Sequence, residues 1–355
     1  MIIKNLSLVN FKNHLDGDFD FHKNINCLVG NNGVGKTNIL DAIYYLAFCK
    51  SFLNAVDSNN ITYEKSFFLI KGVFVKDDEE DVVSCGFKRG DFKRFKKNEK
   101  IYKKLSDHIG YYPLVLISPL DSEIILSGSS VRRKFIDSVI SQFDKQYLSD
   151  LISYNKVLKQ RNMLLKQSVY DDTHLKVYND ELVKYGNSIF IKRKDFINEF
   201  VPVLTKYYNY ISSSKETINV NYKSDLLNFS FSDLLEKNLH KDKILKYTCS
   251  GIHRDDLDFF LNTMKLKKSG SQGQQKSFMI SMKLAKYEYI KQKTKLYPSL
   301  LLDDIFDKLD NERCSRIIEL VNNESFGQIF ITHTCHDTMK DILNRINSDY
   351  IIFRF

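Results

Sequence analysis

The stretch Gly30-Asn31-Asn32-Gly33-Val34-Gly35-Lys36-Thr37 decides the fold of this 355-residue chain. It fits the phosphate-binding pattern G-x-x-x-x-G-K-[ST] at every fixed position. The apolar run 25–29 before it predicts a strand, and apolar spacing at 39–47 after it predicts a helix. Glycines let backbone N–H groups converge on phosphate oxygens, and the helix N-terminus adds positive potential. A chance glycine-rich turn would not bring this context, so the stretch predicts a nucleotide site.

Each residue of this loop has an expected role toward ATP and Mg²⁺. The Lys36 ammonium is expected to bridge the β- and γ-phosphates, and the Thr37 hydroxyl to ligate Mg²⁺. The remaining loop positions are expected to surround the nucleotide: Gly30, Asn31, Asn32, Gly33, Val34, Gly35 and Asn38. The loop alone does not say which class of enzyme uses it.

Two carboxylates end the apolar run Leu300-Leu301-Leu302-Asp303-Asp304. Beside a phosphate loop, we expect Asp303 to hold Mg²⁺ and Asp304 to orient or deprotonate the attacking water. The second carboxylate favours hydrolysis, because kinases with this loop do not need it. His333 ends the strand-like run 329–333 and is a candidate to hydrogen-bond the γ-phosphate. The alternatives are a capped turn for the aspartates and a surface position for the histidine.

A second anion cradle is predicted at Ser269-Gly270-Ser271-Gln272-Gly273-Gln274-Gln275-Lys276, which precedes a helical run. The candidate ligands there are Ser271, Gly273 and Gln274, at a helix N-terminus. A two-fold dimer explains a second cradle, because each cradle then meets the γ-phosphate held by the other copy. The alternative is a polar loop that only caps the helix.

Composition favours an intracellular chain with a polyanionic partner. The net charge is +9, and 43% of the residues are hydrophobic, enough for a sizeable core. The six cysteines lack CxxC spacing, and neither a signal-peptide core nor an apolar stretch of about 18 residues is present. We therefore expect reduced thiols, a cytoplasmic location and no membrane partner.

The candidate DNA contacts are basic. Residues 88–104 carry nine Lys and Arg side chains against Asp91 and Glu99, with interleaved aromatic residues, as in a hairpin with one basic face. The chosen candidates are Lys93, Arg94, Lys96 and Lys97, together with Arg132 and Arg133 at a helix start. The alternatives are a solvated surface for the first group and pairing with Asp137 for the second. The run 77–81 reads as an exposed acidic turn.

Three zones are predicted along the chain. Residues 1–125 form the N-terminal part of an ATPase lobe, residues 126–240 a mainly helical lobe, and residues 241–355 the C-terminal part of the ATPase lobe. The expected fold class is α/β, with a mixed sheet, covering helices and an inserted helical lobe. The helical zone is too poor in heptads for a long coiled coil.

Together these motifs resemble the ABC-type ATPase superfamily and its chromosome-maintenance branch, most closely the RecF family of bacterial recombination-repair proteins. The stretches that carry the resemblance include 10–13, 33–43, 118–121, 132–137 and Lys308-Leu309-Asp310, similar to the superfamily's D-loop. The most specific are Gly251-Ile252-His253-Arg254-Asp255-Asp256 and Ser271-Gln272-Gly273-Gln274-Gln275. The resemblance runs nearly end to end.

The resemblance implies a compact ABC-type head that dimerises with ATP. It also implies binding to double-stranded DNA near gaps, weak DNA-stimulated ATPase activity, and cooperation with RecR and RecO in loading RecA. Lys12 departs from the family's usual arginine, and Lys50-Ser51-Phe52-Leu53 lacks an arginine after its serine. The rival interpretations are the ATPase subunit of a transporter, which needs a much shorter spacing before the signature, and a P-loop kinase, which leaves Ser271–Gln274 unexplained.

Overall fold

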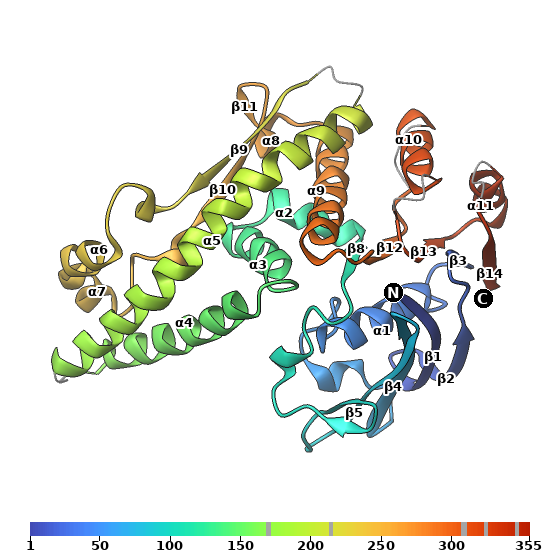
Figure 1. Ribbon diagram of the computed structural model, residues 1–355, viewed down its shortest axis with the longest axis horizontal. Helices are drawn as coiled ribbons and strands as arrows, with labels where there is room; N and C mark the ends of the chain where they lie inside the picture. Colours follow the sequence, from blue (N-terminus) through green and yellow to red (C-terminus); the bar gives the residue numbers. More distant parts are fainter. Residues whose placement is uncertain (168–171, 213–215, 307–310, 323–325, 345–347) are drawn as a thin grey trace. The chain divides into compact units, whose positions relative to one another are not determined.

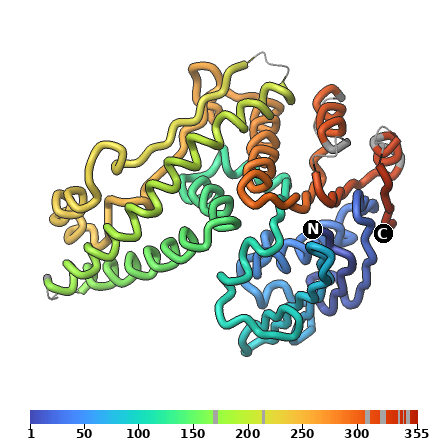
Figure 2. Tube along the Cα trace, viewed as in Figure 1, coloured from blue at the N-terminus to red at the C-terminus, as the bar shows by residue number. Residues whose placement is uncertain are grey.

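The computed structural model describes residues 1–355 except 168–171, 213–215, 307–310, 323–325 and 345–347. Contacts within the chain define two compact units. Unit 1 comprises 1–121, 210–212 and 280–355, and unit 2 comprises 122–209 and 213–279. Figure 1 shows the helices and strands of both units, and Figure 2 traces the chain through them.

Unit 1 contains a six-stranded antiparallel sheet in the order β2-β1-β4-β5-β6-β7. Its strands alternate between buried and exposed residues, because one face covers the core and the other meets solvent. The strands are β1 (Ile2–Phe11), β2 (His14–Asp20), β4 (Phe67–Lys76), β5 (Glu79–Lys88), β6 (Arg94–Lys97) and β7 (Lys100–Ile101). The β6–β7 hairpin confirms the expected hairpin within 88–104.

A five-stranded sheet with parallel pairing, in the order β14-β3-β13-β12-β8, also lies in unit 1. Four of its five strands are fully buried and mostly apolar, as expected for a parallel sheet covered on both faces. The strands are β3 (Ile25–Val29), β8 (Leu114–Ile117), β12 (Ser299–Asp303), β13 (Ile329–His333) and β14 (Tyr350–Arg354). The carboxyl ends of β3, β13 and β12 therefore share one edge of the sheet. The phosphate loop begins at this edge, and Asp303 and His333 end their strands there.

Helix α1 (Lys36–Phe48) contacts strands of both sheets and is almost entirely buried. One apolar cluster joins it to the antiparallel strands and to Leu28, Leu301 and Phe330 of the parallel sheet. The phosphate loop at its start is thus fixed by the core of unit 1. This unit also holds α10 (Asn311–Asn322), α11 (His336–Leu343) and the end of α9 (Gln272–Thr294). Among the described residues, no helix has the length and apolar character needed to cross a bilayer.

Unit 2 is mainly helical. Side-chain hydrogen bonds join its two long helices, from Ser188 to Asp150 at 2.6 Å and from Arg161 to Asn179 at 2.7 Å. A three-stranded antiparallel sheet in the order β11-β10-β9 completes the unit. Its helices are α2 (Glu123–Leu126), α3 (Ser129–Ile140), α4 (Lys145–Leu164), α5 (Asp172–Ser212), α6 (Phe231–Lys237), α7 (Leu239–Leu245) and α8 (Leu266–Ser269), and its strands are β9 (Ile218–Lys223), β10 (Asp256–Leu261) and β11 (Met264–Lys265).

The end of unit 2 differs from the boundary expected at residue 240. Strand β10 pairs with β9 from Asp256↔Lys223 to Leu261↔Ile218, so residues 241–261 are tied to the helical lobe. The following chain stays in unit 2 as far as Met279, within α9. The signature stretch Ser271–Gln275 therefore belongs to unit 2, because strand pairing at long range sets the boundary.

Candidate nucleotide site

The phosphate loop has the backbone that its glycines permit. Gly33 and Gly35 have φ angles of 86° and 109°, in the left-handed region that residues with a Cβ rarely adopt. A Cβ on Gly35 would lie 2.5 Å from His14 Nε2 and 2.6 Å from the Asn13 amide. The loop therefore has room for glycine alone at this position, and it leads directly into α1 at Lys36.

Lys36 lies against the loop that precedes it. Its Nζ donates to the carbonyl of Gly30 at 2.7 Å and to that of Asn31 at 2.9 Å. Burial lowers the pKa of the Lys36 ammonium, while the carboxylates of Asp304 and Asp303 act in the opposite direction. The Lys36 ammonium thus lies within electrostatic range of Asp303 and Asp304, the two acids expected to share its site.

Three oxygen-bearing side chains from three elements meet at the sheet edge. The Thr37 hydroxyl donates to Asp303 Oδ1 at 2.9 Å, and the Thr332 hydroxyl donates to the same oxygen at 2.8 Å. Burial raises the pKa of the Asp303 carboxyl, and these two hydroxyls counter that effect. Hydroxyl and carboxylate oxygens are the ligands that Mg²⁺ prefers, so this donor set fits the ion.

Asp304 has a left-handed backbone, with φ of 49°. Its N–H donates to the Thr332 hydroxyl at 2.9 Å, which fixes the turn directly after β12. Aspartate and asparagine adopt this conformation more readily than most residues with a Cβ. Since backbone strain of this kind concentrates at functional sites, the conformation singles out Asp304 within the strand end.

His333 ends β13, which lies between β3 and β12. Its Nδ1 accepts a hydrogen bond from the Cys335 N–H at 2.9 Å, so a neutral ring carries its proton on Nε2. Its carbonyl accepts from the Gly30 N–H at 3.3 Å, which links the histidine strand to the start of the phosphate loop.

Several of these residues, but not Asp303 or His333, line a cavity of about 210 Å³ in unit 1. Six members of the phosphate loop and its helix start face one side, and two residues from the ends of β12 and β13 complete it. The lining residues are Asn32, Gly33, Gly35, Lys36, Thr37, Asn38, Asp304 and Thr332. Thr332 is a site residue that the sequence analysis missed, and the only signal for it was its place beside His333.

The turn between β1 and β2 supports the phosphate loop from outside, which the sequence analysis also missed. The Asn13 amide donates to Gly33 O at 3.3 Å and accepts from the Asn38 amide at 2.7 Å. His14 Nε2 lies 3.1 Å from Gly35 O. These contacts fix two carbonyls of the phosphate loop and the side chain of Asn38. The turn therefore positions the loop.

The departures from the family pattern form one buried network. Lys12 pairs with Asp41 of α1, which also accepts from the Ser51 hydroxyl at 2.6 Å and the Phe52 N–H at 2.8 Å. The Ser51 hydroxyl in turn accepts from the Asn54 N–H at 2.9 Å. Asp41 therefore anchors the 50–54 loop to the phosphate-loop helix, and Lys12 balances the charge of this buried carboxylate.

Ser271 forms a reciprocal cap at the start of α9. Its hydroxyl accepts from the Gln274 N–H at 3.2 Å, and its own N–H donates to Gln274 Oε1 at 2.7 Å. Gln274 also donates to Glu216 at 2.5 Å. Because the cap uses only a lone pair of the hydroxyl, its O–H remains able to donate to an anion. The D-loop-like residues Lys308, Leu309 and Asp310 lie outside the described residues.

All four candidate DNA contacts chosen in 88–104 have acidic partners. Lys93 bonds Asp57 and the Cys49 carbonyl, each at 2.9 Å, and Lys97 pairs with Asp81 at 2.9 Å. Asp81 is buried, which corrects the expectation that it belongs to an exposed acidic turn. Arg94 pairs with Asp91 at 3.3 Å and Lys96 with Glu99 at 2.9 Å, in more exposed positions.

Arg132 and Arg133, at the start of α3, bind acceptors within unit 2. Arg132 is buried and binds both carboxylate oxygens of Asp256, at 2.6 and 3.0 Å. Arg133 donates to the carbonyl of Asp255 at 2.7 Å. Neither pairs with Asp137, which instead accepts from Arg193 at 2.9 Å. These contacts give the two arginines a structural role. Arg132 has little exposed surface with which to contact DNA.

His253, within the specific stretch Gly251–Asp256, is held as a neutral ring. Its Nε2 lies 3.0 Å from Thr248 O, which can only accept, and its Nδ1 lies 2.8 Å from the Tyr154 hydroxyl. The proton therefore lies on Nε2, and Nδ1 accepts from Tyr154. Burial lowers the pKa of His253 to about 4.

Acid is expected to destabilise the fold through this histidine. Because the unfolded chain takes up the proton near the ordinary pKa of about 6.5, stability is complete above that value and is lost as pH falls toward 4. The free energy of unfolding should decrease by about 2 kcal/mol between pH 7 and pH 5 from this group alone. Denaturant unfolding at both pH values, compared with His253→Gln, measures it. An equal pH dependence in both proteins would contradict this assignment.

Known proteins match both the sequence and the fold. Residues 5–325 match the family described as AAA domain. The "DNA replication and repair protein RecF" of Flavobacterium johnsoniae is 47% identical over 99% of both chains, and that of Bacteroides fragilis (strain YCH46) is 46% identical over 100% of this chain and 96% of its own.

Solved structures of related proteins have a similar fold. The "recombination mediator protein RecF-ATP in RecFOR pathway" has a TM-score of 0.87 at 30% identity, over 94% of this chain and 92% of that one. An Smc head domain from Pyrococcus furiosus has a TM-score of 0.57 at 16% identity, over 96% and 91%, and shows the fold alone.

The two sheets around α1, with the phosphate loop and the Asp303–Asp304 strand end on one edge, have the α/β head fold that Smc head domains share, the fold expected of an ABC-type head. This confirms the expected α/β fold with its inserted helical lobe. The chain belongs to the RecF family of DNA replication and repair proteins. Membership leaves the transporter-subunit and kinase alternatives without support.

Proposed function

We propose that this chain binds ATP with Mg²⁺, hydrolyses it slowly, and uses the cycle to control its own dimerisation and its binding to DNA. The observation that carries this proposal is the cluster of Lys36, Thr37, Asp303 and Asp304 at one edge of the parallel sheet. A related chain solved as RecF-ATP supports the choice of nucleotide.

The residues divide the chemistry among them. Lys36 and the loop N–H groups would hold the phosphates. Thr37 and Asp303 would hold Mg²⁺, which would supply positive charge against that of the phosphates. Asp304 orients the attacking water and accepts its proton, and His333 donates from Nε2 to the γ-phosphate. The side chain of Asp304 is one methylene shorter than the glutamate that transporter ATPases generally carry at this position. We therefore expect slow ATP hydrolysis, which suits a switch.

The second cradle acts across a dimer. Ser271 keeps a donor after capping α9, and the helix start adds the N–H group of Gly273, while the Gln274 N–H is used by the cap. We assign these groups to the γ-phosphate bound by a second copy of the chain. ATP then joins two protomers, and loss of the γ-phosphate releases them.

Duplex DNA near single-strand gaps is the proposed partner, and RecR and RecO are the proposed protein partners in loading RecA. The names of the relatives and the RecFOR pathway of the solved neighbour support these choices. The basic sequence, with a net charge of +9, suits a phosphate backbone.

Within unit 1 the antiparallel sheet offers the surface that suits DNA best. Lys71, Ser84 and Lys96 face one another across β4, β5 and β6, and Arg94 lies in the next outward row, opposite Gly86. Lys88 belongs to the same outward set, since alternate residues of a strand share a face. We call Lys71, Lys88, Arg94 and Lys96 the outer basic face and propose that it contacts DNA phosphates.

DNA affinity should depend on the nucleotide and on this face. We expect the tightest binding with ATP on gapped duplex, weaker binding with ADP, and the weakest binding to single strands. The double variant Lys88→Glu/Arg94→Glu should weaken duplex binding at least about tenfold, because two phosphate contacts are replaced by repulsion. Fluorescence anisotropy over a salt series measures both effects. Nucleotide-independent affinity would contradict the switch, and unchanged affinity in the double variant would contradict the face.

A further inference from the structure

The stretch Gly251–Asp256 is fixed from inside unit 2 by nearly every residue it contains. Gly251 has φ of 125°, and a Cβ there would lie 2.5 Å from the Phe231 ring and 2.7 Å from the Tyr154 hydroxyl. His253 bonds Tyr154 and Thr248, and Asp256 forms a two-pronged pair with Arg132. Such closely packed, hydrogen-bonded backbone has little freedom.

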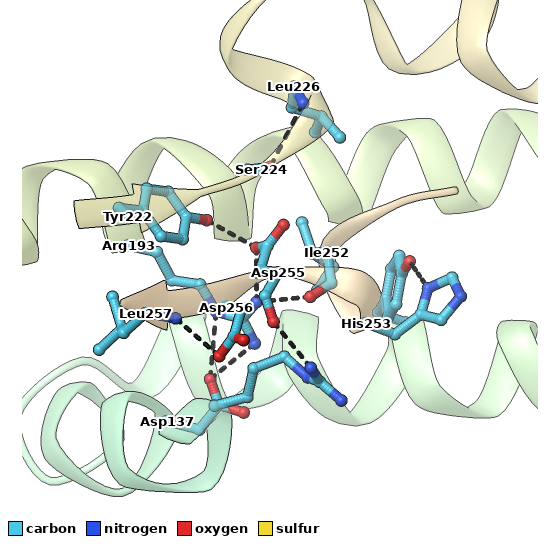
Figure 3. A network of polar contacts seen from close by, with 12 residues as sticks. Asp137, Arg193, Tyr222, Ser224, Leu226, Ile252, His253, Asp255, Asp256 and Leu257 are labelled. Atoms are coloured by element: carbon cyan, nitrogen blue, oxygen red, sulfur yellow. Dashed lines mark hydrogen bonds and ion pairs between the residues drawn. The ribbon is translucent and has the colours of Figure 1, made fainter. Parts of the chain in front are cut away.

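A buried ion network underlies this stretch (Figure 3). Arg193 donates to Asp255 Oδ2 at 2.8 Å, to the Ile252 carbonyl at 2.7 Å and to Asp137 at 2.9 Å. The Tyr222 hydroxyl donates to Asp255 Oδ2 at 2.6 Å. Asp255 and Arg193 are each 1% exposed. A buried pair with this many partners resists rearrangement, because breaking it leaves an uncompensated charge.

Arg254 is the exception in this stretch. Its side chain is exposed, and within the described ranges it has no hydrogen bond or ion pair. It borders a cavity of about 380 Å³ in unit 2, whose other lining residues are Tyr222, Lys223, Ser224, Asp225, Leu227 and Asn228. The network thus fixes the backbone on both sides of one unpaired guanidinium, at the rim of a cavity.

The cavity is lined mainly by polar groups that suit an oxyanion. Arg254 offers a planar fork of N–H donors, and Lys223 and Asn228 add an ammonium and an amide, while the Ser224 hydroxyl is bonded to the Asp255 carboxylate. Lys223 is shared with Asp258, at 2.5 Å, and the Asp225 carboxylate opposes an anion. Leu227 and the ring of Tyr222 are the apolar groups in the lining, and the hydroxyl of Tyr222 is bonded to Asp255, so polar side chains make up most of the cavity wall.

We propose that this cavity, the Arg254 cavity, binds a phosphate group of the DNA backbone, with the Arg254 guanidinium as its principal ligand. This inference rests on the proposed binding of DNA and adds a contact in unit 2 that is independent of the outer basic face. The buried network holds the backbone of Arg254 in place before DNA arrives, which lowers the backbone entropy lost on binding.

The test is duplex-DNA affinity of Arg254→Ala in the full chain with ATP, over a salt series. Affinity should fall about tenfold at 0.1 M salt, and the slope of log affinity against log salt should decrease by about one, as for the loss of one phosphate contact. Asp225→Asn should act in the opposite direction and tighten binding several-fold, since it removes the opposing charge. ATP binding and ATP-dependent dimerisation should remain at wild-type levels in both variants.

Lys194→Ala is the matched control, because Lys194 is an exposed cation of α5 outside the cavity. Equal affinities for Arg254→Ala and Lys194→Ala, with tight binding by the wild type, would overturn this proposal alone. Absence of DNA binding by the wild type would overturn the proposed function instead. Unchanged DNA binding by Arg254→Ala, with loss of binding to purified RecR or RecO, would assign the cavity to a protein carboxylate and also refute the phosphate assignment.

Discussion

Replacing Asp304 with asparagine is expected to reduce ATP hydrolysis at least about a hundredfold, because general-base catalysis typically contributes a factor of this size or more. Asparagine tolerates the left-handed φ of 49° at this position, and the N–H donated to Thr332 is unchanged. The fold and ATP binding should therefore persist. Phosphate release under single-turnover conditions measures the loss.

The same variant should accumulate as a dimer with ATP and Mg²⁺, since the γ-phosphate that joins the protomers is no longer removed. ADP should leave it monomeric. Hydrolysis at the wild-type rate would exclude Asp304 as the base. A chain that stays monomeric with ATP would contradict the switch, even if hydrolysis were lost.

Replacing Ser271 with arginine is expected to abolish ATP-dependent dimerisation while ATP binding stays within about twofold of the wild type. The substitution removes the hydroxyl that caps α9 and places a bulky cation where we expect the partner's γ-phosphate to enter. Equilibrium nucleotide binding and light scattering separate the two effects.

Ser271→Thr is the matched control, because threonine keeps both the hydroxyl and the helix cap. It should dimerise with ATP. Loss of ATP binding in Ser271→Arg equal to that in Lys36→Met would show that both residues serve one site within a single chain, against the shared arrangement.

The parts of the site that follow from local sequence could be predicted. The strand 25–29, the loop and α1 are contiguous, so spacing alone placed Lys36 and Thr37 together. The run Leu300–Asp304 predicted a buried strand with acids at its end, and the Thr37–Asp303 hydrogen bond joins this strand end to the phosphate loop.

The remaining parts depend on pairing between distant segments. Thr332 was missed because its contact with Asp303 arises only when β13 pairs with β12. Asn13 and His14 were missed because their contacts with loop carbonyls and with the Asn38 amide arise only when the β1–β2 turn folds against the phosphate loop.

Charge patterns were the least reliable guide. Lys93 and Lys97 look like members of a basic surface run, yet their partners Asp57 and Asp81 come from other parts of the chain. Arg132 and Arg133 were likewise assigned to DNA, although β10 supplies the acid that binds Arg132. Conversely, Lys71 joins the outer basic face only through the β4–β5–β6 register.

The most direct test of the shared site is to mix two inactive variants, Lys36→Met and Ser271→Arg, and to measure ATP hydrolysis. Each alone should be inactive and monomeric. In a mixed dimer, one site pairs an intact Lys36 with an intact Ser271 from the other chain, so mixing should restore up to about half of the wild-type rate. A mixture no more active than the sum of its two components would contradict the account.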